Sequence, residues 1–138
     1  MLAPDVRFKG STERHCRIGR SAFREYREAI RGILADYRCD ILDVSHGDCR
    51  MYVPDPMLEG FGLGDVAGPH CVARVKFSGK HVAPFHTSKL LASFAPTGTK
   101  LSWIGIAYFF FTSDGKYIQS LWVMGDVASL HEQLAAGI

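Results

Sequence analysis

Asp126 and His81 are the side chains of this sequence best suited to move a proton. Asp126 follows Trp122 by four residues. A carboxylate held against an indole ring is poorly solvated, which raises its pKa towards the pH at which it would act as a base. His81 follows a predicted strand end, where it could donate to a substrate carbonyl or orient a water molecule. Two plainer interpretations stay open, in which Asp126 only caps the last helix and His81 is an ordinary loop histidine.

Five further residues are candidates for the wall of a ligand site. Trp103, Tyr108, Phe110 and Trp122 could form a flat apolar slot for an aromatic or polycyclic ligand. Arg74 could balance an enolate or a substrate carboxylate. The alternatives are that the aromatic residues are core packing and that Arg74 faces outwards.

The sequence contains no pattern that is typical of a metal or cofactor site. Its other five histidines lack H-x-x-x-H spacing, and its four cysteines include no C-x-x-C pair. The run Gly-Phe-Gly-Leu-Gly at 60–64 neither follows a predicted strand nor opens a predicted helix, so it does not indicate a phosphate-binding loop. We therefore expect no metal and no cofactor.

Two amphipathic helices are predicted from apolar residues at three- and four-residue spacing. The first covers 21–34, with Phe23, Tyr26 and Ile30 on its apolar face and Ser21 as its N-cap. The second is short, begins after Asp126 and ends near Gly137.

Strand patterns predict a sheet between these helices. Predicted strands cover 37–44, 70–77, 101–111 and 116–123, with a hairpin turn at 112–115. Between the first two strands, residues 54–69 are rich in glycine and proline, and a loop of this length is often a lid or an interaction surface. Strands together with helices on one side of them indicate the α+β class.

The composition favours one globular domain over residues 1–138. The chain has a net charge of +2, with 22% charged and 47% apolar residues, which excludes a disordered chain. The longest apolar run, about eight residues, is too short for a membrane helix. The first residues do not form a signal peptide, so we expect a cytoplasmic protein. No motif accompanies the basic residues near the start, and we predict no nucleic-acid partner.

Several short segments, taken in order, resemble the SnoaL-like polyketide cyclases and ester cyclases of the nuclear-transport-factor-2-like superfamily. They include Pro96-Thr97-Gly98, the aromatic strand after Trp103, the turn Asp114-Gly115-Lys116, and Trp122 followed by Gly125-Asp126. The resemblance covers nearly the whole chain. It departs in Ser120-Leu121, where many members carry Glu-His, and in 45–69, which looks like an insertion. Family members also usually start with a long helix, and this chain begins after it.

The resemblance implies a cone-shaped curved antiparallel sheet, with helices packed on its concave face around a pocket. It also implies cofactor-free ring closure, an acid/base role for Asp126 and dimerisation through the sheet. We therefore expect a small apolar or polycyclic carbonyl ligand and a cyclase or isomerase that uses Asp126 and His81. The alternative, a non-catalytic binding or interaction module on the same fold, stays open.

Overall fold

The structure, a computed structural model, describes residues 1–13, 15–48, 51–52, 65–66 and 69–137. Its helices are α1 (Arg20–Ile33) and α2 (Val127–Ala136). Its strands are β1 (Leu2–Lys9), β2 (Arg17–Ile18), β3 (Leu34–Asp48), β4 (Met51–Tyr52), β5 (Asp65–Val66), β6 (Pro69–His81), β7 (Lys100–Phe111) and β8 (Ile118–Gly125).

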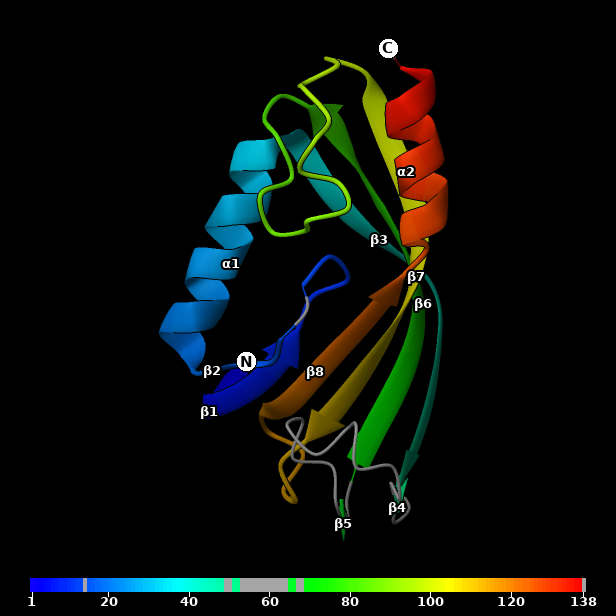
Figure 1. The fold of residues 1–138 in the computed structure, drawn as a ribbon. Coiled ribbons are helices and arrows are strands. Elements are labelled where there is room, and N and C mark those ends of the chain that lie inside the picture. Colours follow the sequence, from blue (N-terminus) through cyan, green and yellow to red (C-terminus); the bar gives the residue numbers. More distant parts are fainter. Residues whose placement is uncertain (14, 49–50, 53–64, 67–68, 138) are drawn as a thin grey trace.

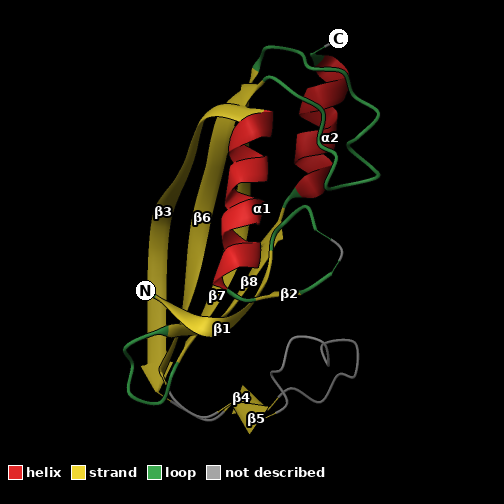
Figure 2. Ribbon diagram, turned by 90° about the vertical axis from the view of Figure 1, so that its left-hand side faces the viewer, coloured by secondary structure: helices red, strands yellow, loops and turns green. Residues whose placement is uncertain are grey.

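Six strands form one curved sheet in the order β2-β1-β8-β7-β6-β3, while β4 and β5 pair with each other (Figure 1). Both helices lie on the same side of this sheet (Figure 2). The predicted α+β class, with helices on the concave face, is confirmed. One strand pair departs from the expected antiparallel sheet, since β1 pairs with β8 in parallel.

Helix α1 forms where the periodicity predicts it. Its apolar face buries Ile30 and Ile33 against the sheet, whereas its arginine and glutamate side chains stay exposed. The predicted N-cap at Ser21 is wrong: Gly19 precedes the helix with φ 98°, and it makes no side-chain cap hydrogen bond. Glycine suits this position because residues with a Cβ rarely adopt such a φ.

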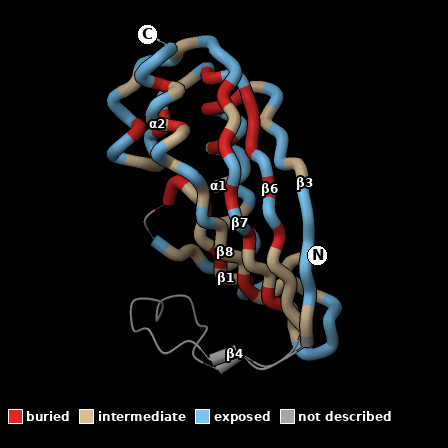
Figure 3. The backbone as a smooth tube through the Cα atoms, turned by 90° about the vertical axis from the view of Figure 1, so that its right-hand side faces the viewer, coloured by how far each residue is buried: buried red, intermediate tan, exposed pale blue. Residues whose placement is uncertain are grey.

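The central strands alternate between an inner face, towards the helices, and an outer face. Along β6, Ala73, Val75 and Phe77 are buried while Arg74 and Lys76 are exposed. Buried residues follow β6 and β7, and β3 at the sheet edge is largely exposed (Figure 3). The strands predicted at 37–44 and 70–77 are confirmed and are longer than expected. The period-two pattern therefore sets which side chains meet the helices.

The core lies where α2 and the loop at 82–99 cover one end of the sheet. Phe85 and Leu91 from the loop, Leu101 from β7, and Leu130 and Leu134 from α2 are fully buried together. The predicted turn at 112–115 is also present, since the Thr112 N–H donates to the Tyr117 carbonyl at 2.8 Å. Within the described ranges, no helix is long and apolar enough to cross a membrane.

Candidate functional site

Asp126 is the N-cap of α2. Its Oδ1 accepts a hydrogen bond from the Ser129 backbone N–H at 2.9 Å, and the residue is exposed. The premise that apolar neighbours desolvate this carboxylate is therefore wrong, because solvent reaches it. Asp126 therefore occupies the helix-cap position, which was the plainer of the two interpretations of the sequence.

His81 is fully buried at the end of β6. Its Nδ1 accepts from the Thr97 backbone N–H at 3.2 Å, and its ring lies 5.4 Å from the Phe85 ring, centroid to centroid. Burial lowers the pKa of His81, which favours the neutral imidazole. Among the described residues its Nε2 has no hydrogen-bond partner. Through its hydrogen bond with Thr97, His81 thus connects the loop at 82–99 to the end of β6.

The structure does not bring Asp126 and His81 together. The Asp126 N–H donates to the Ile104 carbonyl, and the His81 N–H donates to the Thr99 carbonyl. The two accepting residues, Ile104 and Thr99, are five residues apart along an extended chain, which corresponds to a distance of roughly 16 Å. An acid/base pair that shares one small substrate atom is not formed by this arrangement.

Four of the five predicted wall residues lie on the outer face, away from α1. Arg74 pairs with Asp43 at 2.8 Å, with more than half of each side chain exposed. The Tyr108 ring neighbours Trp122 at 6.3 Å and Phe110 at 6.4 Å, centroid to centroid. Their position along the strands turns these four side chains away from α1, so they do not line the cavity beneath that helix, and their role in binding a ligand stays a prediction.

Trp103 points inwards but packs in the core. It is 4% exposed and lies 5.3 Å from the Phe77 ring, centroid to centroid. It does not line the cavity under α1. Core packing, the alternative reading of the sequence, is its observed role.

An apolar cavity of about 400 Å³ lies between α1 and the inner face of the sheet. Phe23, Tyr26 and Ile30 line it from the helix. The lining residues on the central strands are Val75, Phe77, Ala107, Phe109, Leu121 and Val123. Cys39 and Ile41 line it from β3, where both are exposed, so the cavity opens at that edge. A volume of this size is at the lower end of the range of ligand pockets.

The polar groups of this apolar cavity are hydrogen-bond donors. Burial and the nearby Glu13 carboxylate raise the pKa of Tyr26, and burial raises the pKa of Tyr37 and of Cys39. These groups stay protonated near neutral pH, and Arg27 at the cavity edge is a further donor. Among the described lining residues there is no carboxylate and no imidazole. The cavity can therefore donate to a ligand oxygen but lacks a base of its own.

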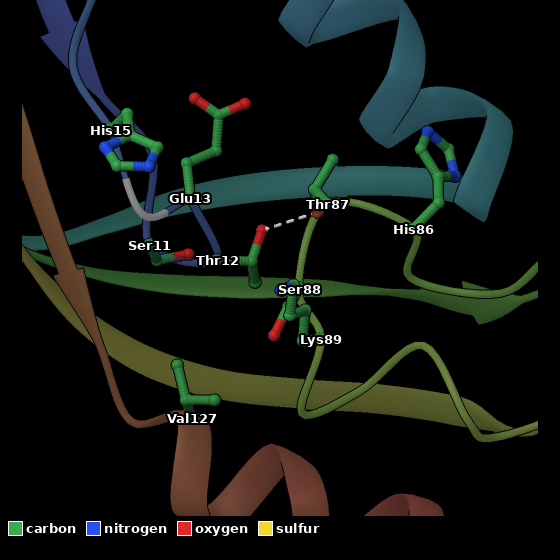
Figure 4. A pocket seen from close by; sticks show the side chains of 9 residues that line it. All are labelled: Ser11, Thr12, Glu13, His15, His86, Thr87, Ser88, Lys89 and Val127. Atoms are coloured by element: carbon green, nitrogen blue, oxygen red, sulfur yellow. Dashed lines mark hydrogen bonds between the residues drawn. The ribbon is translucent and has the colours of Figure 1, made fainter.

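A second, polar cavity of about 510 Å³ lies between the loop that follows β1 and residues 86–89 (Figure 4). The Thr12 and Thr87 hydroxyls are 3.1 Å apart and join these two segments. Glu13 and Lys89 supply its charged side chains, and His15 and His86 lie on opposite sides of it. None of the predicted site residues lines this cavity.

Sequence reasoning missed the residues that line the apolar cavity, although the pattern carried a signal for them. Phe23, Tyr26 and Ile30 form the predicted apolar face of α1, so the strand residues that meet this face are the cavity wall. Aromatic content alone indicates Tyr108 and Trp122, which lie on the opposite face. Strand alternation would have found the wall only once the inner face was known.

Two sequence-based expectations concern ions and loops. Within the parts of the chain that the structure describes, no group of three or more histidine, cysteine, aspartate or glutamate residues is arranged to hold a metal ion. The glycine- and proline-rich segment 54–69 lies almost wholly outside the described residues, so its predicted role as a lid or interaction surface stays a prediction.

No protein-family model and no curated protein sequence matches this chain. Solved structures match its fold. A protein from Jannaschia sp. CCS1, described as a SnoaL-like polyketide cyclase, matches with a TM-score of 0.66 at 12% identity, over 98% of this chain and 74% of that chain. TsrD from Streptomyces laurentii matches with a TM-score of 0.65 at 22% identity, over 98% of this chain and 78% of that one.

A third solved structure, described as a polyketide cyclase from Acidithiobacillus ferrooxidans, matches with a TM-score of 0.65 at 16% identity, over 99% of this chain and 79% of that one. Identities this low establish a shared fold and leave the activity to be argued from this chain's own residues. The curved sheet with both helices on one side is therefore the fold of the SnoaL-like polyketide cyclases.

Proposed function

We propose that this protein binds a small, largely apolar carbonyl compound in the cavity beneath α1. The observation that carries the proposal is the lining of that cavity, which is apolar apart from donors such as the Tyr26 and Tyr37 hydroxyls. An apolar wall favours an apolar ligand body, and a few fixed donors select a ligand with an acceptor oxygen. Because both phenols stay protonated, each can donate to a carbonyl.

Filling the cavity tests the proposal. Ala107 is 3% exposed and lines the cavity, so Ala107→Phe should occupy the ligand's space. The matched control is Ala128→Phe, at an exposed position on α2. We expect 1-tetralone to raise the melting temperature of the wild type and of the control but not of Ala107→Phe. An equal rise in Ala107→Phe would place the ligand elsewhere.

Comparing the affinities of a ketone and its parent hydrocarbon distinguishes the contribution of the hydrogen-bond donors from that of the apolar wall. We expect 1-tetralone to bind more tightly than tetralin, which has the same rings without the carbonyl. Tyr37→Phe removes one buried hydroxyl and should reduce that preference by about threefold to tenfold. If tetralin binds as well as 1-tetralone, the hydroxyls do not recognise the ligand.

A cyclase or isomerase that acts through Asp126 and His81 is the finer form of this proposal. Such chemistry begins with removal of a proton next to a carbonyl. The lack of a carboxylate or an imidazole among the described lining residues favours the alternative, a binding module without catalysis. Exchange of the α-protons of 1-tetralone in D₂O, followed by NMR, distinguishes the two. Exchange that requires Asp126 supports catalysis, whereas binding without exchange supports the module.

We also propose that two copies pair through the outer face of the sheet. Three apolar side chains are exposed on this face, namely Ile104 (41%), Ile106 (44%) and Met124 (61%). Solvent-exposed apolar patches on a sheet are often protein–protein interfaces. Ile106→Arg should then lower the mass measured by light scattering from dimer to monomer. Leu90→Arg, on the loop at 82–99, is the matched control and should stay dimeric. A monomeric wild type would contradict the pairing.

A further inference from the structure

A groove at the start of α1, here called the arginine groove, borders the apolar cavity. Its volume is about 340 Å³, and it lies where α1 begins beside β1 (Figure 1). Its lining residues are Met1, Leu2, Arg20, Phe23, Arg24 and Arg27. Phe23 and Arg27 also line the apolar cavity, so the groove and the cavity meet at these two side chains.

Three arginines give the arginine groove a positive charge. Arg20, Arg24 and Arg27 follow one another at spacings of four and three residues, which places them on one face of the helix. All three are exposed. The Arg20 Nε donates to the Leu2 carbonyl at 2.8 Å, which holds this side chain against the start of β1. Guanidinium groups therefore stand directly beside an apolar ligand cavity.

Within the described ranges, no acidic side chain balances these charges. None of the three arginines forms an ion pair there, and no carboxylate lines the groove or the apolar cavity. The acidic residues of α1, Glu25 and Glu28, are exposed outside both. Like charges four residues apart on a helix repel each other, so an anion bound between them is favoured.

We propose that the ligand of the apolar cavity carries an anionic group, a carboxylate or a phosphate, which binds in the arginine groove. The inference rests on the proposed function, because it places the ligand's apolar body and carbonyl beneath α1. The anionic group extends past Phe23 to Arg24 and Arg27. A guanidinium group matches a carboxylate or a phosphate with two parallel hydrogen bonds. One helix thus supplies both the apolar contacts and the recognition of charge.

Calorimetric titration with a charged and a neutral form of one ketone tests the inference. The probes are 3-benzoylpropionate and its methyl ester, which share the aromatic ring and the carbonyl but differ in charge. We expect the carboxylate to bind about tenfold more tightly than the ester. Phenacyl phosphate carries a phosphate group beside a similar ketone. The ratio of its affinity to that of 3-benzoylpropionate tells which anion the groove prefers.

Arginine variants locate the anionic group. Arg24→Gln and Arg27→Gln should each reduce the preference for the carboxylate over the ester by about threefold to fivefold, the effect of one exposed ion pair. The matched control is Arg31→Gln, because Arg31 is exposed on the same helix but lines neither the groove nor the apolar cavity. This control should keep the full preference. Since all three arginines are exposed, the variants should fold like the wild type.

Some results would overturn the inference and leave the proposed function in place. One is a carboxylate that binds no more tightly than its ester, or not at all, while 1-tetralone binds. Another is a preference that survives both Arg24→Gln and Arg27→Gln, or that Arg31→Gln reduces as much. Equal binding of the carboxylate to Ala107→Phe would show that the anion does not need the apolar cavity. If neither 1-tetralone nor any charged probe binds, the proposed function fails together with the inference.

Discussion

The Tyr26 hydroxyl lies directly over Gly10. A Cβ on Gly10 would stand 2.5 Å from the Tyr26 ring carbon that bears the hydroxyl. Gly10 also begins a turn, in which its carbonyl accepts from the Glu13 N–H at 3.2 Å. Tyr26 lines the apolar cavity and Glu13 lines the polar one, so this contact lies at the boundary between the two.

Gly10→Ala should therefore destabilise the protein. The added methyl group overlaps a largely buried ring, and forced repacking of this kind costs about 1–3 kcal/mol. The free energy of unfolding in urea measures the effect. Gly32→Ala is the control: a Cβ there meets nothing within 4 Å, and alanine in a helix gains about 0.5–1 kcal/mol over glycine. Equal effects of the two changes would contradict the close approach at Gly10.

Asp126→Ala should lower the free energy of unfolding by about 1 kcal/mol, because it removes the cap of α2. Asp126→Asn should be nearly neutral, since asparagine caps a helix about as well as aspartate. Glu132→Ala, at an exposed position on the same helix, provides the control. A loss in Asp126→Asn as large as in Asp126→Ala would show that the charge, and not the cap, stabilises this end of the helix.

Stability should fall in mild acid because of His81. Burial lowers the pKa of His81 in the folded protein, so the unfolded chain binds its proton first as the pH falls. The contribution of His81 is fully present above about pH 6.5, the unfolded value, and is lost progressively as the pH falls towards the lower folded value. Urea unfolding at a series of pH values between about 5 and 7.5, the range in which histidine titrates, measures this loss.

His81→Asn should flatten that dependence on pH, whereas His86→Asn, at an exposed position, should leave it in place. Protonation of His81 also places a hydrogen on Nδ1, which then faces the Thr97 N–H as donor against donor. An unchanged slope in His81→Asn would assign the acid sensitivity to other groups.

Arg74→Ala should change stability by less than about 0.5 kcal/mol, because its ion pair with Asp43 is exposed. The same variant should bind 1-tetralone like the wild type, since Arg74 is on the face opposite the apolar cavity. Calorimetric titration measures the binding. A tenfold loss of affinity would contradict this prediction and show that Arg74 contributes to ligand binding.

Local patterns predicted most of the elements. The apolar spacing of 21–34 and the β-branched and aromatic run at 101–111 specify α1 and β7 within a residue of their observed ends. Resemblance to the SnoaL-like cyclases predicted the fold class correctly. Strand β1 and its parallel pairing with β8 were not predicted, because the two partners lie more than a hundred residues apart and no local pattern links them.

The sequence by itself determined the alternation of each strand, the amphipathic faces of the helices and the capping aspartate, since these depend on neighbouring residues. Only the tertiary structure decided which strand face meets α1. That choice put Val75 and Ala107 in the cavity wall and Arg74 and Tyr108 outside it. It also brought Glu13 and Lys89 to one cavity. The physical reason is that a shift of one residue in strand register exchanges the two faces without changing the local pattern.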